Sequence, residues 1–254
     1  MSWCAPNAWL RCFARNPAAR ARCYLLPHAG GGASFYRHWA QVCSSDLELW
    51  VVQYPGREDR TREPLLPRMS QLVDRMVEGL LPQLDMPFVL LGHSMGAAVA
   101  FELTKRLERV ARPPRLLVAS SLMPPTRLYR RCLHLGSDAD LWQELVHNGG
   151  TRAEVAAEPT IRDFFTPALR NDYRLIETYL PSSGLPLHTP ICALYGEQDD
   201  QIEAADMAAW QQHTRAPLHL RSFAGGHFYI VPHREAVLTQ VSQLLACAPA
   251  FAAQ

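Results

Sequence analysis

The sequence lacks an excess of charge of either sign. Its 254 residues include 25 Lys and Arg against 24 Asp and Glu, which gives a formal net charge of +1. No overall field therefore attracts nucleic acid or an anionic lipid surface. A basic helix with interleaved aromatic residues is missing as well. We therefore expect neither nucleic acid nor a membrane as a partner.

Long apolar runs and a targeting pattern are also missing. The first ten residues carry no cationic run followed by a long apolar stretch, which argues against a secretory signal. The longest apolar runs, such as Phe88-Val-Leu-Leu91, are far too short to span a bilayer. A composition with 48% hydrophobic and 19% charged residues is that of an ordinary globular protein. We expect a cytoplasmic protein.

The cysteines show no pairing pattern. There are 7 of them, an odd number, and none belongs to a Cys-x-x-Cys pair. Neither a disulfide framework nor a zinc site is therefore indicated. Cys23 and Cys192 stand among apolar residues, and we expect both to be buried as small hydrophobic side chains.

Short apolar runs alternate with longer stretches of helical period. Most of the short runs are nearly continuous in apolar residues, as expected for strands whose two faces are both covered by helices. They predict strands over 23–26, 49–53, 88–91, 116–119, 191–195 and 218–222. Helices are predicted over 70–84, 97–109, 203–213 and 233–246. This alternation predicts one α/β domain over 1–254 with a mostly parallel central sheet and helices on both faces.

One segment departs from this alternation. About seventy residues separate the strand that ends near Ser121 from the strand that begins at Ile191, more than a single crossover uses. The stretch 138–179 has helical spacing, with Pro159 and Pro167 as interruptions. It either adds core or forms a lid above the strand ends. The lid is favoured because substrate-gating loops occupy that rim.

The motif Gly92-His93-Ser94-Met95-Gly96 lies between a predicted strand and a predicted helix. A Gly-x-Ser-x-Gly sequence in this context is typical of the nucleophile elbow of the α/β-hydrolase fold, because the sharp turn needs small residues around the serine. The alternative is that the small residues only ease the packing of helix on strand. The context favours Ser94 as a nucleophile at the top of the sheet.

A serine hydroxyl is a poor nucleophile near neutral pH, so Ser94 needs a base, and the base needs an orienting acid. In this fold the three follow in the order Ser, acid, His. His227 stands in a glycine-containing loop after the last predicted strand and is the predicted base. His28 and His93 are expected to pack or to form local hydrogen bonds.

The acid is expected in the loop that follows the strand over 191–195. Asp199 is preferred because its Gly-x-x-Asp spacing suits the acid turn of this fold. Asp200 is a close rival, and Glu197 is a third candidate. The loop after the strand over 116–119 offers no carboxylate.

Stabilising the oxyanion of an acyl transfer requires two donors. One is expected to be the backbone N–H of Met95, which follows the nucleophile. The other is expected from the glycine-rich loop 27–32, with Ala29 preferred and Gly30 as the alternative. The loop could also be a plain turn without this role.

Taken together, these residues resemble the type II thioesterases that accompany nonribosomal peptide and polyketide synthetases. The matching pieces run from near residue 20 to near residue 235 in the order found in that family. They are Pro27-His-Ala-Gly-Gly31, Gln53-Tyr-Pro-Gly-Arg-Glu58, Gly92-His-Ser-Met-Gly96, Leu169-Arg-Asn-Asp-Tyr173 with Glu177-Thr-Tyr179, Gly196-Glu-Gln-Asp199 and Gly225-Gly-His-Phe-Tyr229.

The resemblance implies a role for several of these residues. Ser94, Asp199 and His227 would form a catalytic triad, and Ala29 and Met95 the oxyanion hole. The segment from about 127 to 180 would be the mobile helical lid of the family. One departure is Asp200, which stands where many members have proline. The piece Tyr54-Pro-Gly-Arg57 either shapes a loop near the substrate entrance or is a turn with a surface arginine.

The implied activity is the hydrolysis of acyl thioesters on phosphopantetheinyl carrier proteins of a synthetase, with the removal of wrong or stalled acyl groups. Acyl and peptidyl carrier proteins would be its partners, and we expect a monomer. The resemblance implies no metal and no bound cofactor. The first alternative is an esterase or lipase acting on free small esters. Others are a non-catalytic binding protein and a chain-terminating thioesterase from a larger synthetase.

Overall fold

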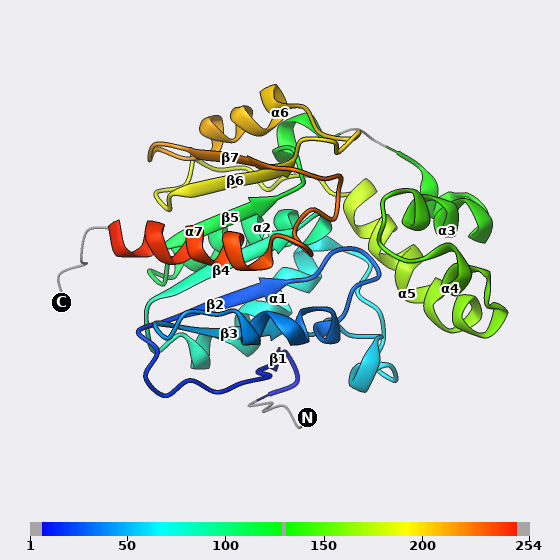
Figure 1. Cartoon of the computed structure of the whole chain (residues 1–254), viewed down its shortest axis with the longest axis horizontal. Coiled ribbons are helices and arrows are strands. Elements are labelled where there is room, and N and C mark those ends of the chain that lie inside the picture. The colour runs from blue at the N-terminus through cyan, green and yellow to red at the C-terminus, as the bar shows by residue number, and fades with distance from the viewer. Residues whose placement is uncertain (1–6, 129–130, 248–254) are drawn as a thin grey trace.

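A single twisted sheet organises the chain. The computed structural model describes residues 7–128 and 131–247, and within them seven strands follow the spatial order β1-β3-β2-β4-β5-β6-β7 (Figure 1). The strands are β1 Leu10–Arg11, β2 Ala21–Leu26, β3 Leu47–Val52, β4 Phe88–His93, β5 Leu116–Ser120, β6 Ile191–Gly196 and β7 His219–Phe223. Strand β1 pairs antiparallel with β3, and every other neighbouring pair is parallel. The predicted mostly parallel sheet is confirmed.

All six predicted strands are present, with ends that differ by at most two residues. Strand β1 was not predicted, because two residues are too few to carry a periodic pattern. The nearly continuous apolar runs arise, as expected, because both faces of these strands are buried. In β2, Tyr24 and Leu26 face one hydrophobic core, whereas Cys23 and Leu25 face the other.

Helices cover both faces of the sheet (Figure 1). The core on one face contains residues of α1 and α2, and the core on the other contains residues of α7 and of the 3-10 helix Ala33–Gln41. The α-helices are α1 Met69–Leu80, α2 Met95–Arg109, α3 Asp138–His147, α4 Ala153–Ala157, α5 Pro159–Glu177, α6 Ala204–Ala208 and α7 Arg234–Cys247. Short 3-10 helices lie at Glu58–Arg60, Leu81–Gln83, Pro125–Arg127, Leu133–Leu135 and Ala209–His213. Among the described residues, no helix combines the length and the apolar character that a membrane span requires.

Two predicted helices are α-helical over only part of their predicted length and continue as 3-10 helices. The helix predicted over 70–84 is α-helical only to Leu80 and continues as the 3-10 turn Leu81–Gln83. Pro82 lacks an N–H group and cannot continue the α-helical ladder, so the last turn tightens. The helix predicted over 203–213 likewise changes to 3-10 geometry after Ala208.

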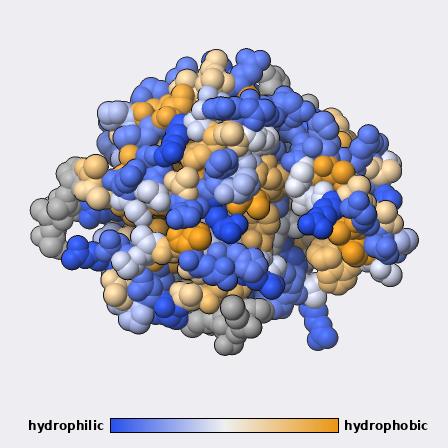
Figure 2. Space-filling model, in the orientation of Figure 1, coloured by the Kyte–Doolittle hydropathy of each residue, from blue (hydrophilic) through white to orange (hydrophobic). Residues whose placement is uncertain are grey.

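The segment between β5 and β6 forms a helical lobe beside the sheet, built from α3, α4 and α5 (Figure 1). The lobe has its own small core of Leu141, Trp142, Ala156 and Leu169. It also exposes apolar side chains to solvent (Figure 2). Residues 129–130, which belong to the predicted lid, lie outside the described residues.

One prediction about this lobe is wrong. Pro159 begins α5, as expected of a proline that interrupts a helix, but Pro167 lies inside α5. A proline at 167 removes the hydrogen bond to the carbonyl of Asp163. Both residues are exposed, so water can satisfy that carbonyl and the helix continues.

Candidate active site

Ser94 occupies a sharp turn between β4 and α2. Its backbone has φ 53° and ψ −126°, a conformation that is strained for a residue with a side chain. The Ser94 N–H donates to the Ser120 carbonyl at 2.8 Å, which ties the turn to β5. A Cβ atom at Gly92 would lie 2.0 Å from the Gly96 carbonyl oxygen, and one at Gly96 would lie 2.1 Å from that of Leu26. The motif is therefore a tight strand-to-helix elbow that only glycine at both ends permits.

His227 and Asp199 lie together at the carboxyl ends of neighbouring strands. Nδ1 of His227 is 2.8 Å from Oδ2 of Asp199, and both residues are buried. Because a carboxylate only accepts hydrogen bonds, Nδ1 carries the proton and Nε2 is left as the basic nitrogen. The Gln201 N–H donates to the other carboxylate oxygen of Asp199 at 3.2 Å. The pair is therefore oriented as a base with its supporting acid.

The two competing acids have other partners than His227. Asp200 is exposed, and its carboxylate pairs at 2.8 Å with Nε2 of His147 at the end of α3. Glu197 accepts a hydrogen bond from Ser222 Oγ at 2.8 Å on the solvent side. Of the three acids considered from the sequence, Asp199 is the one that contacts His227.

The glycine-rich loop after β2 lies beside the elbow. Ala29 lines the same cavity as Ser94 and Met95, and Met95 is the first residue of α2. The first N–H groups of a helix have no partner within the helix, so that of Met95 is available. The Gly30 N–H is not, because it donates to Oδ2 of Asp172 at 2.8 Å. This geometry favours Ala29 over Gly30 as the second donor.

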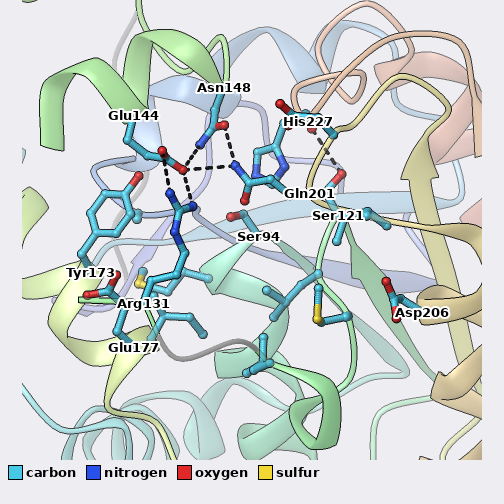
Figure 3. A pocket seen from close by; sticks show the side chains of 18 of the residues that line it. Ser94, Ser121, Arg131, Glu144, Asn148, Tyr173, Glu177, Gln201, Asp206 and His227 are labelled. Carbon is cyan, nitrogen blue, oxygen red and sulfur yellow. Dashed lines mark hydrogen bonds and ion pairs between the residues drawn. The ribbon is translucent and has the colours of Figure 1, made fainter. Parts of the chain in front are cut away.

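A cavity of about 400 Å³ surrounds Ser94 and is bounded by the acid loop, the segment after β5 and the helical lobe. Figure 3 shows Ser94 and His227 on its wall. One part of the lining is apolar and contains Leu122, Met123, Leu128, Ile176 and Ile202. Such a cavity has the size and the mixed lining of a small-molecule site.

Another part of the lining is a polar network that the sequence did not reveal (Figure 3). Glu144 of α3 accepts hydrogen bonds from both terminal nitrogens of Arg131 and from the amide groups of Asn148 and Gln201. Burial is the largest single effect on Glu144 and favours its neutral form. The hydrogen bond and charge of Arg131, the hydrogen bond from Asn148 and the charge of His147 together outweigh it and keep the pKa of Glu144 below its usual value. Because Gln201 follows the acid loop, the network connects the helical lobe to that loop. Glu144 and Asn148 lie four residues apart, but Arg131 and Gln201 are more distant in the sequence, so no local pattern identifies the network as a whole.

His28 and His93 are buried, and they pack or form local hydrogen bonds as predicted. His93 Nδ1 lies 2.9 Å from Ser120 Oγ, which in turn lies 2.7 Å from the Tyr229 hydroxyl. The ring of His28 packs edge-on against Phe228. Burial lowers the pKa of His28 to about 3 and that of His93 well below its usual value, so both are neutral. His93 supports the site through packing and a local hydrogen bond, and His28 through ring packing.

Arg57 is not the surface residue that one interpretation of its turn expected. It is 5% exposed, and its guanidinium forms a two-pronged ion pair with Asp172 of α5, with distances of 2.6 and 2.8 Å. Burial is the largest single effect and lowers the pKa of Arg57, but the charge and hydrogen bonds of Asp172, with smaller contributions from Tyr54 and Glu58, together raise the pKa above its ordinary value. The resemblance to type II thioesterases included both the piece 53–58, with Arg57, and the piece 169–173, with Asp172. It did not indicate that these two pieces are in contact.

Comparisons with known proteins agree with this geometry. The family model described as a thioesterase domain matches residues 22–245. A protein named "Probable cadicidin biosynthesis thioesterase" from Streptomyces griseus is 39% identical over 237 residues, which are 93% of this chain and 66% of that protein. The thioesterase PikA5 from Streptomyces venezuelae is 34% identical over 93% of this chain and 85% of its own length. The chain thus spans just under two thirds of the first relative and more of the second.

A solved structure gives the same result. The type II thioesterase BorB from the borrelidin biosynthetic cluster superposes with a TM-score of 0.88 at 36% identity, covering 95% of this chain and 99% of that one. Its similarity extends over the sheet and the helical lobe together, because so little of either chain is left out. The chain therefore belongs to the thioesterase family, as a hydrolase of the type II thioesterase group with the α/β-hydrolase fold.

Proposed function

We propose that this enzyme hydrolyses acyl thioesters carried on the phosphopantetheine arm of carrier proteins in a nonribosomal peptide or polyketide synthetase. The observation that carries the proposal is the buried His227–Asp199 pair, whose histidine lines the same cavity as the elbow serine, Ser94. Membership of the type II thioesterase group supports the choice of a thioester as substrate.

In the proposed mechanism, Ser94 Oγ attacks the thioester carbonyl carbon while Nε2 of His227 takes the hydroxyl proton. The N–H groups of Met95 and Ala29 stabilise the oxyanion, and Asp199 stabilises the imidazolium. The tetrahedral intermediate then expels the thiol, which receives the proton from His227. Water, deprotonated by the same His227, attacks the acyl-enzyme and releases the free acid. Ser94 regains its proton in this last step.

The cavity lining supports an acyl substrate. The apolar residues Leu122, Met123, Leu128, Ile176 and Ile202 offer an environment for an acyl chain beside Ser94. Part of the wall comes from α3 and α5, so the segment 127–180 would act as a lid whose displacement admits the acyl arm. In this proposal the chain is one hydrolase domain that carries this lid.

The proposal is tested with defined carrier proteins. Carriers loaded with acetyl, longer acyl or aminoacyl groups are incubated with the enzyme, and mass spectrometry follows the mass of the carrier arm. Loss of the acyl group, dependent on Ser94, is expected. Carriers that stay loaded through many equivalents of enzyme would overturn the proposal.

A matching oxygen ester addresses the esterase interpretation, which the comparisons do not favour. We expect kcat/KM to be higher for the acyl carrier protein than for a p-nitrophenyl ester of the same acyl group. Labelling of Ser94 by a fluorophosphonate addresses the non-catalytic interpretation, since a pure binding protein would not react. We further propose that the enzyme acts in the cytoplasm as a monomer. Size-exclusion chromatography tests the oligomeric state.

A further inference from the structure

Asp172 of α5 contacts the glycine-rich loop directly. It is 2% exposed. Its Oδ2 accepts the Gly30 N–H at 2.8 Å and the Arg57 Nη1 at 2.6 Å, while Oδ1 accepts the Arg57 Nη2 at 2.8 Å. Arg57 Nη1 also donates to the Gly31 carbonyl at 3.0 Å. One ion pair thus holds both an N–H and a carbonyl of the same loop.

We propose that Asp172 and Arg57 are positioning residues for the oxyanion hole, and that they make its geometry depend on the docking of α5. This inference rests on the proposed function, because it assumes that the Ala29 N–H is one of the two oxyanion donors.

The hydrogen bonds of the loop explain how the pair would act. The bond to Asp172 turns the Gly30 N–H away from the cavity and fixes the peptide plane that follows Ala29. On the other side, the Gly31 N–H donates to the His28 carbonyl at 3.0 Å. Both flanks of Ala29 are therefore held, and Ala29 remains on the cavity wall with Ser94 and Met95. A donor held in place costs no reorganisation when charge develops on the substrate oxygen.

A purely structural role explains the pair less well. Burying two charges costs desolvation energy, and apolar residues of similar volume often hold two elements together equally well. Apolar residues, however, could not accept the Gly30 N–H or donate to the Gly31 carbonyl. Arg57 and Asp172 are 115 residues apart in the sequence, and both converge on this one loop.

The pair also links the loop to the helical lobe. A Cβ atom at Gly30 would lie 2.9 Å from Leu169 Cδ1, so α5 packs directly on the loop. Leu169 and Asp172 lie three residues apart on one side of α5. If α5 moved away, the Gly30 N–H would lose its acceptor and the loop its fixed orientation. The oxyanion hole would then be complete only when α5 is packed down.

The test compares two substitutions of Asp172 that both remove its charge but differ in whether they leave a hydrogen-bond acceptor for the Gly30 N–H. Asp172→Asn keeps an acceptor for the Gly30 N–H but loses the charge, whereas Asp172→Leu loses both. Asn171→Ala is the matched control, since the side chain of Asn171 anchors the same helix to the Leu66 carbonyl, at 3.2 Å, instead of to the glycine-rich loop. For each variant we would measure kcat and KM on a p-nitrophenyl ester, the rate of fluorophosphonate labelling of Ser94, and Tm.

The expected result separates positioning from stability. Asp172→Leu should lower kcat and the labelling rate about 10²-fold to 10³-fold, the usual effect of losing one oxyanion donor, with KM nearly unchanged. Asp172→Asn should lower kcat and the labelling rate less, by about tenfold. Asn171→Ala should keep wild-type kcat. Equal kcat in Asp172→Leu and Asn171→Ala, or losses of kcat that only follow Tm, would overturn the inference.

A double substitution covers the case in which Asp172→Leu does not fold because Arg57 is left as an unpaired buried charge. Arg57→Met combined with Asp172→Leu removes both charges, and such replacements are often neutral for stability. This variant should fold and still show the loss of kcat; a folded double variant with wild-type kcat would refute the role. The labelling rates decide on Asp172 even if wild-type enzyme leaves carrier thioesters intact, which would defeat only the proposed function.

Discussion

At the residue scale, Asp199 and Asp200 are adjacent in the sequence but have opposite environments. Asp199 is buried against His227, whereas Asp200 is exposed and pairs with His147 of α3. Both residues lie in the loop after β6, which ends at Gly196, so no strand alternation fixes which of the two side chains faces His227. The local sequence alone could not decide which.

Asp199→Asn should therefore lower kcat by about 10⁴-fold, because the amide can present its N–H to His227 Nδ1 and so stabilise the wrong tautomer. Asp200→Asn should change kcat by less than about tenfold, since an exposed ion pair contributes little. Steady-state kinetics on one thioester would measure both. The reverse ranking would assign the acid role to Asp200.

Ser94→Ala should lower kcat by about 10⁶-fold, as expected for a nucleophile that acts as one unit with its base. The fold should persist, because the change removes only one oxygen at the cavity wall. Ser121→Ala is the control: its hydroxyl lines the same cavity but only donates to the His227 carbonyl at 3.2 Å. Comparable losses of kcat in the two variants would argue against Ser94 as the nucleophile.

At the element scale, the strand-to-helix elbow and the helical lobe define the site from two sides. The elbow is a local structure, and its residues lie within five positions of one another. The lobe reaches the site through contacts that join distant segments, among them Glu144 with Gln201 and Asp172 with Gly30.

Alanine at Gly92 or Gly96 should destabilise the enzyme by about 3 kcal/mol or more, because the new Cβ would overlap backbone atoms that cannot move aside. Gly226→Ala is the matched control beside His227, since a Cβ there would meet its nearest neighbour at an ordinary 3.5 Å. Urea unfolding would measure the free energies. Similar values for all three variants would show that the elbow tolerates side chains.

At the scale of the whole molecule, two neutral histidines lie buried beneath the site, and their protonation opposes folding. The pKa of His28 is lowered from 6.5 to about 3, mainly by burial, and the pKa of His93 is lowered well below its usual value for the same reason. Between about pH 3 and pH 6.5, His28 is protonated in the unfolded chain but not in the folded chain, so the unfolded chain binds more protons. Stability is therefore present above about pH 6.5 and is lost as the pH falls.

The free energy of unfolding should accordingly fall on acidification below about pH 6.5, by up to about 1.4 kcal/mol per pH unit for each histidine. Urea unfolding at a series of pH values would measure the slope. His28→Gln should flatten it, whereas His219→Gln, at an exposed position of β7, should leave it unchanged. An unchanged slope in His28→Gln would mean that this imidazole does not oppose folding in acid.

The sequence by itself determined the alternation of strands and helices and the elbow around Ser94. Both depend on residues close together in the chain, where periodicity and small side chains act locally. Only the tertiary structure decided that Asp199 faces His227 and that Arg57 is buried against Asp172. It also decided that the Gly30 N–H donates a hydrogen bond to the Asp172 carboxylate. These choices depend on how segments that are 28 to 142 residues apart in the sequence pack together, because the neighbours of a polar group in space determine whether it is buried.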